Sequence, residues 1–497
     1  MSRRRKPRTP ATSSTPPNDG TPLGGLSDAD LLREVARRRL AKGTFDIDAI
    51  EELATAAQRD LGEETLAAAI AALPPEDDKP KACPKCRQPV PVKAKNRLRH
   101  ILTTAGELRL ARNYHYCTNC GRGFAPRDAE LNLPEEGEVS TAMERRILDF
   151  GVNDTFESVA ERWSIHFPTS IISSNLVRRV VDRVGLRCES AYSEEALQMA
   201  CREKPEEPPA MLTVATDGSM LHTREANWKE VKVGVVARGG FIPPGEERPR
   251  RRVEDARYVA VLGGQLEFKK GMAAALAVER ADEVGTVVWL GDGARENWTL
   301  ASELCPLAIQ VLDVPHAVHW GMLCGKAFLG EGHCLLPQWE ARIHELLDAD
   351  SPEAAIQELM NCLEFAATAE QLAALDDVVG YYRANEKRMQ YRTFRSLGLP
   401  VGSGIVESAH RHVLQVRMKR AGQRWGMVRA RRMVRLRAAY RTAGAVRFHR
   451  AIRDGLKAPA ATHKHQLRPN APRRVLRNYT KSRVSPLNRA AAAAASK

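Results

Sequence analysis

The order of apolar runs between residues 211 and 315 restricts the fold of this chain more than any other feature. Three β-branched runs follow one another, MLTVAT, KEVKVGVVAR and RYVAVLG, and polar segments join them. The helical stretch EFKKGMAAALAVERADEVG comes next, followed by the apolar run TVVWLGDGA, the helical stretch ENWTLASELCP and the run AIQVLDVPHA. Because TVVWLG is apolar without alternation, it predicts a strand buried on both faces. The segment therefore predicts an α/β fold with a mixed five-stranded sheet and flanking helices.

Three meandering strands followed by helix, strand, helix and strand are typical of a ribonuclease-H-like core, which we expect over residues 211–320. In that order the first and fourth strands are neighbours. Asp217 follows the first apolar run and Asp292 the fourth, each directly before a glycine. Asp-Gly is also a common hairpin turn, but a helical stretch, not a returning strand, follows Asp292. We therefore predict that both aspartates end strands at one sheet edge, where they would need Mg²⁺ or Mn²⁺ between them.

A third carboxylate is expected from the segment 396–450, which we interpret as the final core helix and a basic DNA-binding helix. Glu407 follows the tight loop LPVGSG, in which Ser403 can cap a helix that starts near residue 404. It is the only acid between residues 387 and 453. A glutamate in the first turn is also favoured by the helix dipole alone. Residues 321–395 carry several amphipathic helical patterns and predict an all-helical insertion before this segment.

Four cysteines predict a structural zinc site in a ribbon over residues 80–128. Cys83 and Cys86 form one Cys-x-x-Cys pair, and Cys117 and Cys120 form a second. Two alternating runs around a turn at Ala105-Gly106 separate the pairs and predict a hairpin. Two such pairs supply four thiolates for a closed tetrahedral Zn²⁺ site, which stabilises or binds but does not catalyse. A redox dithiol is the alternative, and the matched pairs around a hairpin argue against it.

The remaining N-terminal parts are a disordered basic segment (residues 1–26), a helical arm (27–75) and three helices over 138–190. Helix, helix, short turn and capped helix are the outline of a helix-turn-helix DNA-binding domain. In that case four residues would lie early in the recognition helix, near base edges or phosphates: Ser170, Ser173, Ser174 and Asn175. A plain helical linker is the alternative. Residues 457–497 predict a disordered basic tail.

The charge of the chain points to double-stranded DNA as its partner. The net charge is +15, and residues 411–450 hold 13 Arg or Lys and no acid. We interpret this stretch as a helix whose apolar side packs on the core while its cations face phosphates. A solvated basic face is the alternative, against which the absence of counter-charge in the stretch argues. The predicted DNA contacts are Arg417, Lys419, Arg420, Arg424, Arg429, Arg431 and Arg432.

No window approaches 18 uninterrupted apolar residues, and no apolar segment follows the basic N-terminus. The sequence therefore predicts neither a membrane span nor a secretory signal. We expect a cytoplasmic, nucleoid-associated protein with reduced thiols.

At the level of motifs, the chain resembles DDE transposases of the ISKra type, a bacterial insertion-sequence group related to the Mutator-like transposases. The resemblance rests on DG...WKEVKVGVV, GDGA, LDVPHAVHW, YYRANEKRMQYRTFRSLGLPVGSGIVESAHRHV, RMKRAGQRW and the upstream CPKC...RNYHYCTNCGRGFAPRD, which together span roughly residues 80–445. LPVGSGIVES is the specific block, whereas the short DG pairs are not specific by themselves.

The resemblance implies that Asp217, Asp292 and Glu407 form the metal-binding triad. It also implies that Asp313 and His316 match the C/D-x-x-H motif of the wider group, so that His316 would support catalysis near the scissile phosphate. The expected activity is two-metal cleavage at element ends and strand transfer into target DNA, by a homodimer or higher oligomer. A DNA-binding regulator derived from a transposase and a nuclease without strand transfer remain alternatives.

Overall fold

A computed structural model describes residues 47–134, 137–167, 170–190, 193–239, 255–402 and 404–454, with several positions between 27 and 37. The predicted disordered ends at 1–26 and 457–497, most of the first predicted helix and the predicted cap Ser403 lie outside these residues. Within the described residues, no helix is both long and apolar enough to cross a bilayer.

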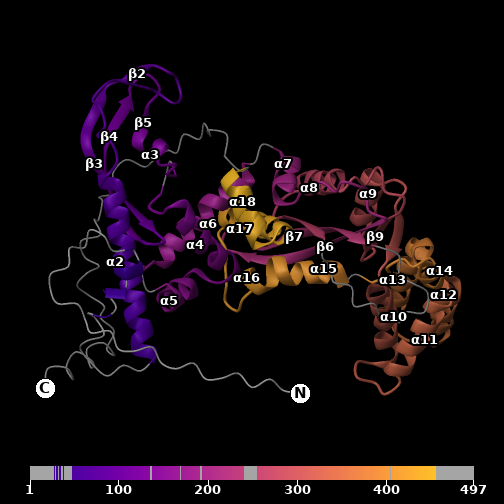
Figure 1. Ribbon diagram of the computed structural model, residues 1–497. Helices are drawn as coiled ribbons and strands as arrows, with labels where there is room; N and C mark the ends of the chain where they lie inside the picture. The colour runs from indigo at the N-terminus through magenta and orange to yellow at the C-terminus, as the bar shows by residue number, and fades with distance from the viewer. Residues whose placement is uncertain are drawn as a thin grey trace, which may run out of the picture. The chain divides into compact units, whose positions relative to one another are not determined.

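The centre of the fold is a mixed five-stranded sheet, as predicted (Figure 1). The order across the sheet is β10-β9-β6-β7-β8. β6 pairs antiparallel with β7, and β7 pairs antiparallel with β8, whereas β9 is parallel to both β6 and β10. The strands are β6 (Met211–Thr223), β7 (Asn227–Gly239), β8 (Ala256–Val261), β9 (Val287–Gly291) and β10 (Ile309–Leu312).

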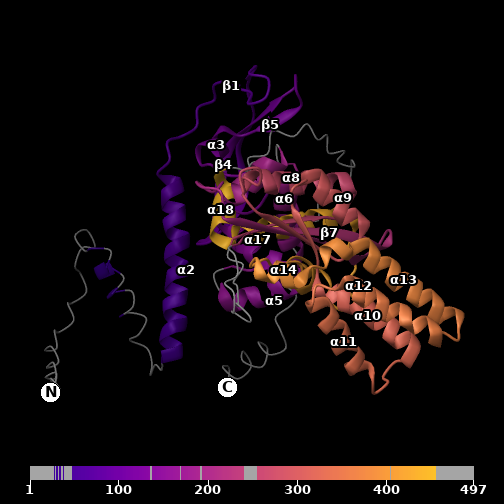
Figure 2. The same ribbon diagram turned by 90° about the vertical axis from the view of Figure 1, so that its right-hand side faces the viewer.

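Helices cover both faces of this sheet (Figure 2). α8 (Gln265–Val278) lies on one face, where a side chain at Gly234 of β7 would meet Met272. α9 (Arg295–Leu304) follows β9 and buries Trp298 against Gly291. On the other face, Val233 and Val235 of β7 belong to the same apolar core as α17 (Met427–Ala443). Successive side chains of β7 therefore pack in two different apolar cores, because they point to opposite faces of the sheet.

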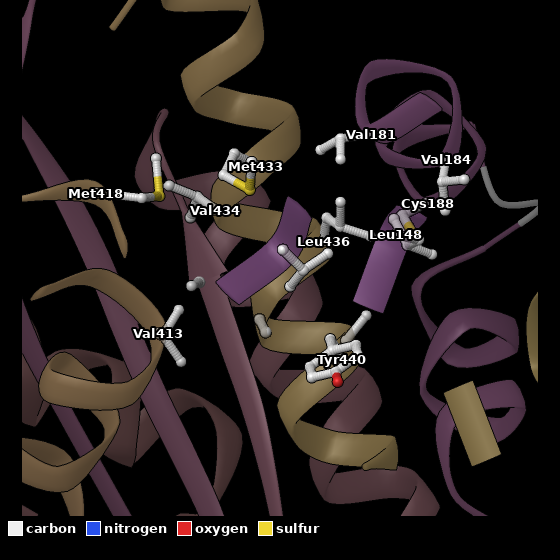
Figure 3. Close-up of a cluster of buried hydrophobic side chains, with 14 of the residues drawn as sticks. Leu148, Val181, Val184, Cys188, Val413, Met418, Met433, Val434, Leu436 and Tyr440 are labelled. Carbon is white, nitrogen blue, oxygen red and sulfur yellow. The ribbon is translucent and has the colours of Figure 1, made fainter. Parts of the chain in front are cut away.

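The three helices predicted within 138–190 are present, but they are part of the core on the α17 face. α4 (Thr141–Asn153), α5 (Phe156–His166) and α6 (Ser174–Glu189) bury one apolar face each. Figure 3 shows Leu148 of α4 and Val181, Val184 and Cys188 of α6 gathered around Leu436 of α17. α7 (Glu194–Cys201) adds Leu197 to this core. One face of α6 therefore packs in the core, and only the opposite face of the helix is able to contact a ligand.

The basic segment 411–450 is not one helix, so that prediction is wrong. α15 (Gly404–Ala409) continues through a π-helical stretch, η3 (His410–Gln415), into the short α16 (Val416–Met418). A loop then leads to α17 and α18 (Ala445–Asp454). The loop is held by Trp425, whose indole donates to the carbonyl of Met418 and whose backbone pairs with β6 at Thr223.

The predicted helical insertion is present between β10 and α15. Its helices pack in one apolar core with β9, β10 and α9. They are α10 (Val314–Leu329), α11 (Leu336–Asp348), α12 (Pro352–Asn361), α13 (Ala369–Asn385) and α14 (Tyr391–Ser396), with 3-10 turns at Cys362–Phe365 and Glu386–Arg388.

The cysteine-rich segment forms the predicted hairpin. β3 (Val92–Thr103) pairs antiparallel with β4 (Gly106–Cys117), and β5 (Arg122–Phe124) pairs with the end of β4. Gly106 has a φ of +125°, which explains the glycine at the turn. The flanking elements are α2 (Ile47–Ala71), β1 (Lys81–Ala82), β2 (Pro89–Val90) and α3 (Pro126–Glu130).

Candidate functional site

Asp217 lies inside β6 and does not end it. The strand continues to Thr223, and the hairpin turn to β7 falls at residues 224–226. The prediction that the strand ends at Asp217 is therefore wrong, and so is the alternative that Asp217-Gly218 is a hairpin turn. What ends near Asp217 is the parallel pairing with β9, whose last pair is Ala215 with Leu290. From Thr216 to Thr223, β6 still pairs with β7, but its other edge no longer pairs with β9.

Asp292 directly follows β9, as predicted. Asp217 and Asp292 each come two residues after the pair Ala215–Leu290. Both residues therefore lie at the same end of the sheet on neighbouring strands, and the charges of both act on His316. The register of two parallel strands therefore brings these two acids to one place.

Asn297 joins the two strand ends, and the sequence did not single it out. Its amide donates to Asp292 Oδ1 at 2.8 Å and to the carbonyl of Thr216 at 3.3 Å. Its side-chain oxygen accepts from the Thr216 hydroxyl at 3.1 Å. Asp292 Oδ1 also accepts from the amide of Ala294 at 2.9 Å. No local motif marks Asn297, because its role depends on a strand 81 residues earlier.

His316 and Asp313 form a pair at the start of α10. Asp313 is fully buried and caps the helix, with Oδ1 accepting from the His316 amide at 2.8 Å. The same oxygen lies 2.7 Å from His316 Nδ1. The contact with Asp313 raises the pKa of His316, although partial burial of the ring opposes this increase. The charges of Asp292 and Asp217 add to the increase. His316 thus lies in the electric field of both aspartates, and its place near a scissile phosphate stays a prediction.

The helix that carries Glu407 reaches the same end of the sheet. His410, three residues after Glu407, places Nε2 at 3.1 Å from Asp217 Oδ2. Residues three apart share a helix face, so Glu407 projects from the His410 side of α15. His410 is buried, and it opens the π-helical stretch, a feature that often occurs at functional sites. The spacing Glu407-x-x-His410 was a usable signal that the sequence analysis missed.

The surroundings of Asp217 favour its ionised form. Burial alone would raise the pKa of this carboxyl, but contact with His410, the Gly218 amide and the charge of His316 outweigh burial and lower the pKa. Lys419 is close enough to feel the charge of Asp217, and its ammonium donates to Ser219. Burial nevertheless lowers the pKa of Lys419. Asp217 is therefore a carboxylate at neutral pH, as a cation ligand must be.

The three acids do not stand at mutual ligand distance in this structure. In the described part of the chain, the only group of three or more His, Cys, Asp or Glu whose ligand atoms all lie within 4.8 Å of one another is the four-cysteine cluster. The structure places Asp217 and Asp292 at one end of the sheet and Glu407 on α15 beside Asp217.

The helical insertion holds the loop after Asp292. The hydroxyl of Tyr381, on α13, donates to the carbonyl of Asp292 at 2.6 Å. Gly293 has a φ of +96°, and a Cβ there would lie 2.5 Å from the Tyr381 ring. The Tyr381 ring stacks on Trp320 of α10 at 4.4 Å. The glycine is therefore required by both the turn and the close approach of the insertion.

The four cysteines are brought together as predicted. Cys83 Sγ lies 3.5 Å from Cys120 Sγ, and Cys86 Sγ lies 3.4 Å from Cys117 Sγ. A hydrogen bond from the Gln88 amide is the main cause that lowers the pKa of Cys86 to about 6. Four thiol ligands in two pairs, with one pair member favouring the thiolate, make a site that is able to bind Zn²⁺. The donor set fits a structural ion.

Several predicted DNA contacts are corrected by the structure, most clearly Arg417. Its side chain is 1% exposed and stacks on Phe156 and Trp425. Burial lowers the pKa of Arg417 to about 10. Arg417 therefore cannot reach a phosphate from the surface, and it is part of the core between α5 and the Trp425 loop.

The predicted absence of counter-charge in this basic stretch is also wrong, since acids from the region of α4–α6 supply it. Arg420 pairs with Asp154 at 2.8 Å, Arg429 with Asp182 at 2.9 Å and Arg432 with Glu189 at 3.1 Å. Lys419, Arg424 and Arg431 are exposed, and no ion pair within the described residues holds them. These three are the best placed of the predicted set for a phosphate contact.

The predicted polar contacts of α6 have structural roles. Ser173 caps the helix by accepting from the Leu176 amide at 3.2 Å, and Asn175 accepts from Arg178 at 2.8 Å. Ser170 is buried and accepts from the indole of Trp163 at 2.9 Å, so its predicted position near bases is wrong. Ser173 and Asn175 remain predictions as DNA contacts.

Comparison with known proteins closes the description of the site. No family model matches the sequence, and no curated protein matches it. Among solved structures, the chain is similar to one titled Drosophila P element transposase strand transfer complex, with 10% sequence identity and a TM-score of 0.31. The match covers 64% of this chain and 95% of the other.

Proposed function

We propose that this protein is a DDE-type DNA transposase with a ribonuclease-H-like core, related to the ISKra group, and that Asp217, Asp292 and Glu407 are its catalytic acids. The observation that carries the proposal is the register of β6 and β9. Two aspartates 75 residues apart each lie two residues beyond the pair Ala215–Leu290, and the charges of both act on His316. A helix from more than 100 residues later places His410 on one of them, with Glu407 a turn before.

The donor set suits hard divalent cations. Three carboxylates supply oxygen ligands, and the lowered pKa of Asp217 keeps that ligand ionised. Mg²⁺ or Mn²⁺ held there would supply an activated water and stabilise the leaving 3′ oxygen during phosphodiester cleavage. Asn297 orients Asp292, and His410 orients Asp217. His316, with its raised pKa, would contribute positive charge beside the scissile phosphate.

Asn297→Ala is expected to reduce Mg²⁺-dependent cleavage about 10- to 100-fold, because groups that orient metal ligands contribute effects of this size. The readout that identifies positioning is the Mg²⁺ concentration for half-maximal rate, which should increase while DNA affinity stays at the wild-type value. Asn297→Asp keeps an acceptor for the Thr216 hydroxyl but loses the donors, and it should be similarly impaired. An unchanged Mg²⁺ dependence in Asn297→Ala would remove Asn297 from the site.

Strand transfer separates the proposal from its alternatives. Purified full-length protein is incubated with labelled element-end duplexes, a supercoiled target plasmid and Mg²⁺ or Mn²⁺. A transposase joins labelled ends to the plasmid, a nuclease cuts without joining, and a regulator binds without cutting. Joined products that need the divalent ion support the proposal. Binding without cleavage in either ion contradicts it.

A further inference from the structure

The cysteine-rich ribbon from β1 to β5 carries a concentrated positive charge. Residues 81–125 contain ten Lys or Arg and one acid, Glu107. A Zn²⁺ ion with four thiolates has a net charge of −2, so the segment keeps a large positive excess. Neighbouring acids neutralise part of it, since Asp128 binds Arg99 and Arg112, and Asp78 binds Lys95.

Two cations of this ribbon are held by aromatic rings instead of acids. Lys93 Nζ lies 4.4 Å from the centroid of the Tyr116 ring, and the guanidinium carbon of Arg97 lies 4.4 Å from that of Tyr114. Among the described residues, neither cation has a carboxylate at ion-pair distance. A cation over a ring keeps its charge and its solvent-facing donors, so both remain available to an anion.

The backbone places the two pairs side by side. Tyr114 and Tyr116 alternate on β4 and so share a side of the ribbon. β3 has register irregularities between Val92 and Arg97, and Asn96 has a φ of +48°. Such bulges re-aim side chains, and here they turn both β3 cations onto the tyrosines. On β5, a Cβ at Gly123 would lie 1.9 Å from the Tyr114 hydroxyl, so only glycine lets that ring lie flat across the ribbon.

The shape of the surface selects among polyanions. At this end of the β3–β4 hairpin, β5 adds a third strand beside β4, and the strands of such a small antiparallel sheet can enter a groove of B-form DNA, as they do in other DNA-binding sheets. The deep, narrow major groove of an A-form RNA duplex does not admit them. Cations held over tyrosine rings suit the phosphates that flank such a groove, because most protein–DNA hydrogen bonds go to the DNA backbone.

We infer that the face formed by Lys93, Arg97, Tyr114 and Tyr116 is a second DNA-binding surface, which grips the phosphates of a B-form duplex away from the catalytic acids. The inference builds on the proposed function, since it assigns the ribbon to the DNA on which the acids would act. The zinc site then serves to hold the hairpin that presents this face.

The test compares duplex binding by full-length wild type and by the double variant Lys93→Ala/Arg97→Ala, with a fluorescent 30-base-pair duplex of arbitrary sequence as probe. Loss of two phosphate contacts is expected to weaken binding about tenfold at moderate salt and to reduce the slope of log affinity against log salt by about 2. The matched control is Lys81→Ala/Arg109→Ala, which removes the same charge from residues that already lie near Asp77 and Glu107. Zinc content is measured in every sample to exclude loss of the ribbon fold.

Each outcome is decisive for one of the two proposals. If the double variant binds like the control, with an unchanged salt slope, the inference is overturned, whether or not the wild type cleaves element ends. If the variant weakens binding to an RNA duplex or a single strand as much as to the DNA duplex, the surface is not a B-form grip and the inference is overturned as well. If binding falls selectively but no protein cleaves in Mg²⁺ or Mn²⁺, the ribbon surface stands and the proposed catalysis fails.

Discussion

Alanine at Asp217, Asp292 or Glu407 is expected to reduce divalent-ion-dependent cleavage of element ends by roughly a thousandfold or more. The reason is that phosphoryl transfer depends mainly on positioned ions and charge, with little covalent work for side chains. Because the three acids act as a unit, a double variant should be little worse than a single one. The measurement is single-turnover cleavage with saturating enzyme, so that binding and chemistry are separated.

The matched control is Glu230→Ala. Glu230 is an exposed acid on the same β6–β7 hairpin, but its pair with Met220 puts it on the opposite sheet face from Asp217, whose pair is Val233. Its variant should cleave at close to the wild-type rate, with unchanged zinc content and end binding. Wild-type rates in the three acid variants would show that the assignment of the site is wrong, whatever their effect on stability.

A second large effect is expected on stability, from Glu279→Ala at the end of α8. Glu279 and Arg257 are both fully buried and in contact at 2.5 Å, and Glu279 also binds Arg238 at 2.6 Å. Arg257 further donates to the carbonyls of Gln198, Arg202 and Glu203, and this ties the end of α7 to β8. Burial lowers the pKa of Arg257, and the charge of Glu279 opposes that decrease. Removing Glu279 leaves a buried cation without its acid.

The expected loss is about 3–5 kcal/mol in the free energy of unfolding, which is typical when one partner of a buried ion pair is deleted. It is measured by urea unfolding of the full chain, followed by tryptophan fluorescence. Glu303→Ala is the control, since Glu303 pairs with Lys269 at 2.8 Å on the surface, with side chains 47% and 39% exposed. That variant should lose about 1 kcal/mol or less. Equal losses in the two variants would mean that the buried pair contributes no more than a surface one.

Local patterns were enough to predict the elements of the fold. Periods of two and 3.6 in the apolar residues predicted the strand and helix order from β6 to β10, and the structure confirms this order. Two Cys-x-x-Cys pairs around an alternating segment predicted the cysteine cluster, which the structure also confirms. These features depend on residues close in the chain, and their geometry follows from short-range sterics.

Strand length and surface charge could not be predicted in the same way. The polar residues after Asp217 suggested that β6 ends there, but pairing with β7 extends the strand to Thr223. Residues 411–450 contain no acid, yet Asp154, Asp182 and Glu189 from α4–α6 and their junctions neutralise arginines there. An acid that lies 240 or more residues away in the chain cannot be identified as the partner of an arginine from the sequence around that arginine.

The sequence by itself determined the α/β class, the five-stranded order, the hairpin with its four cysteines and the two aspartates after apolar runs. Only the tertiary structure decided that the two aspartates lie at the same end of the sheet, that Asn297 and His410 contact them, and that Arg417 is buried. The physical reason is that secondary structure follows from the periodicity of adjacent side chains, whereas a site is made by strand register and helix packing between distant segments.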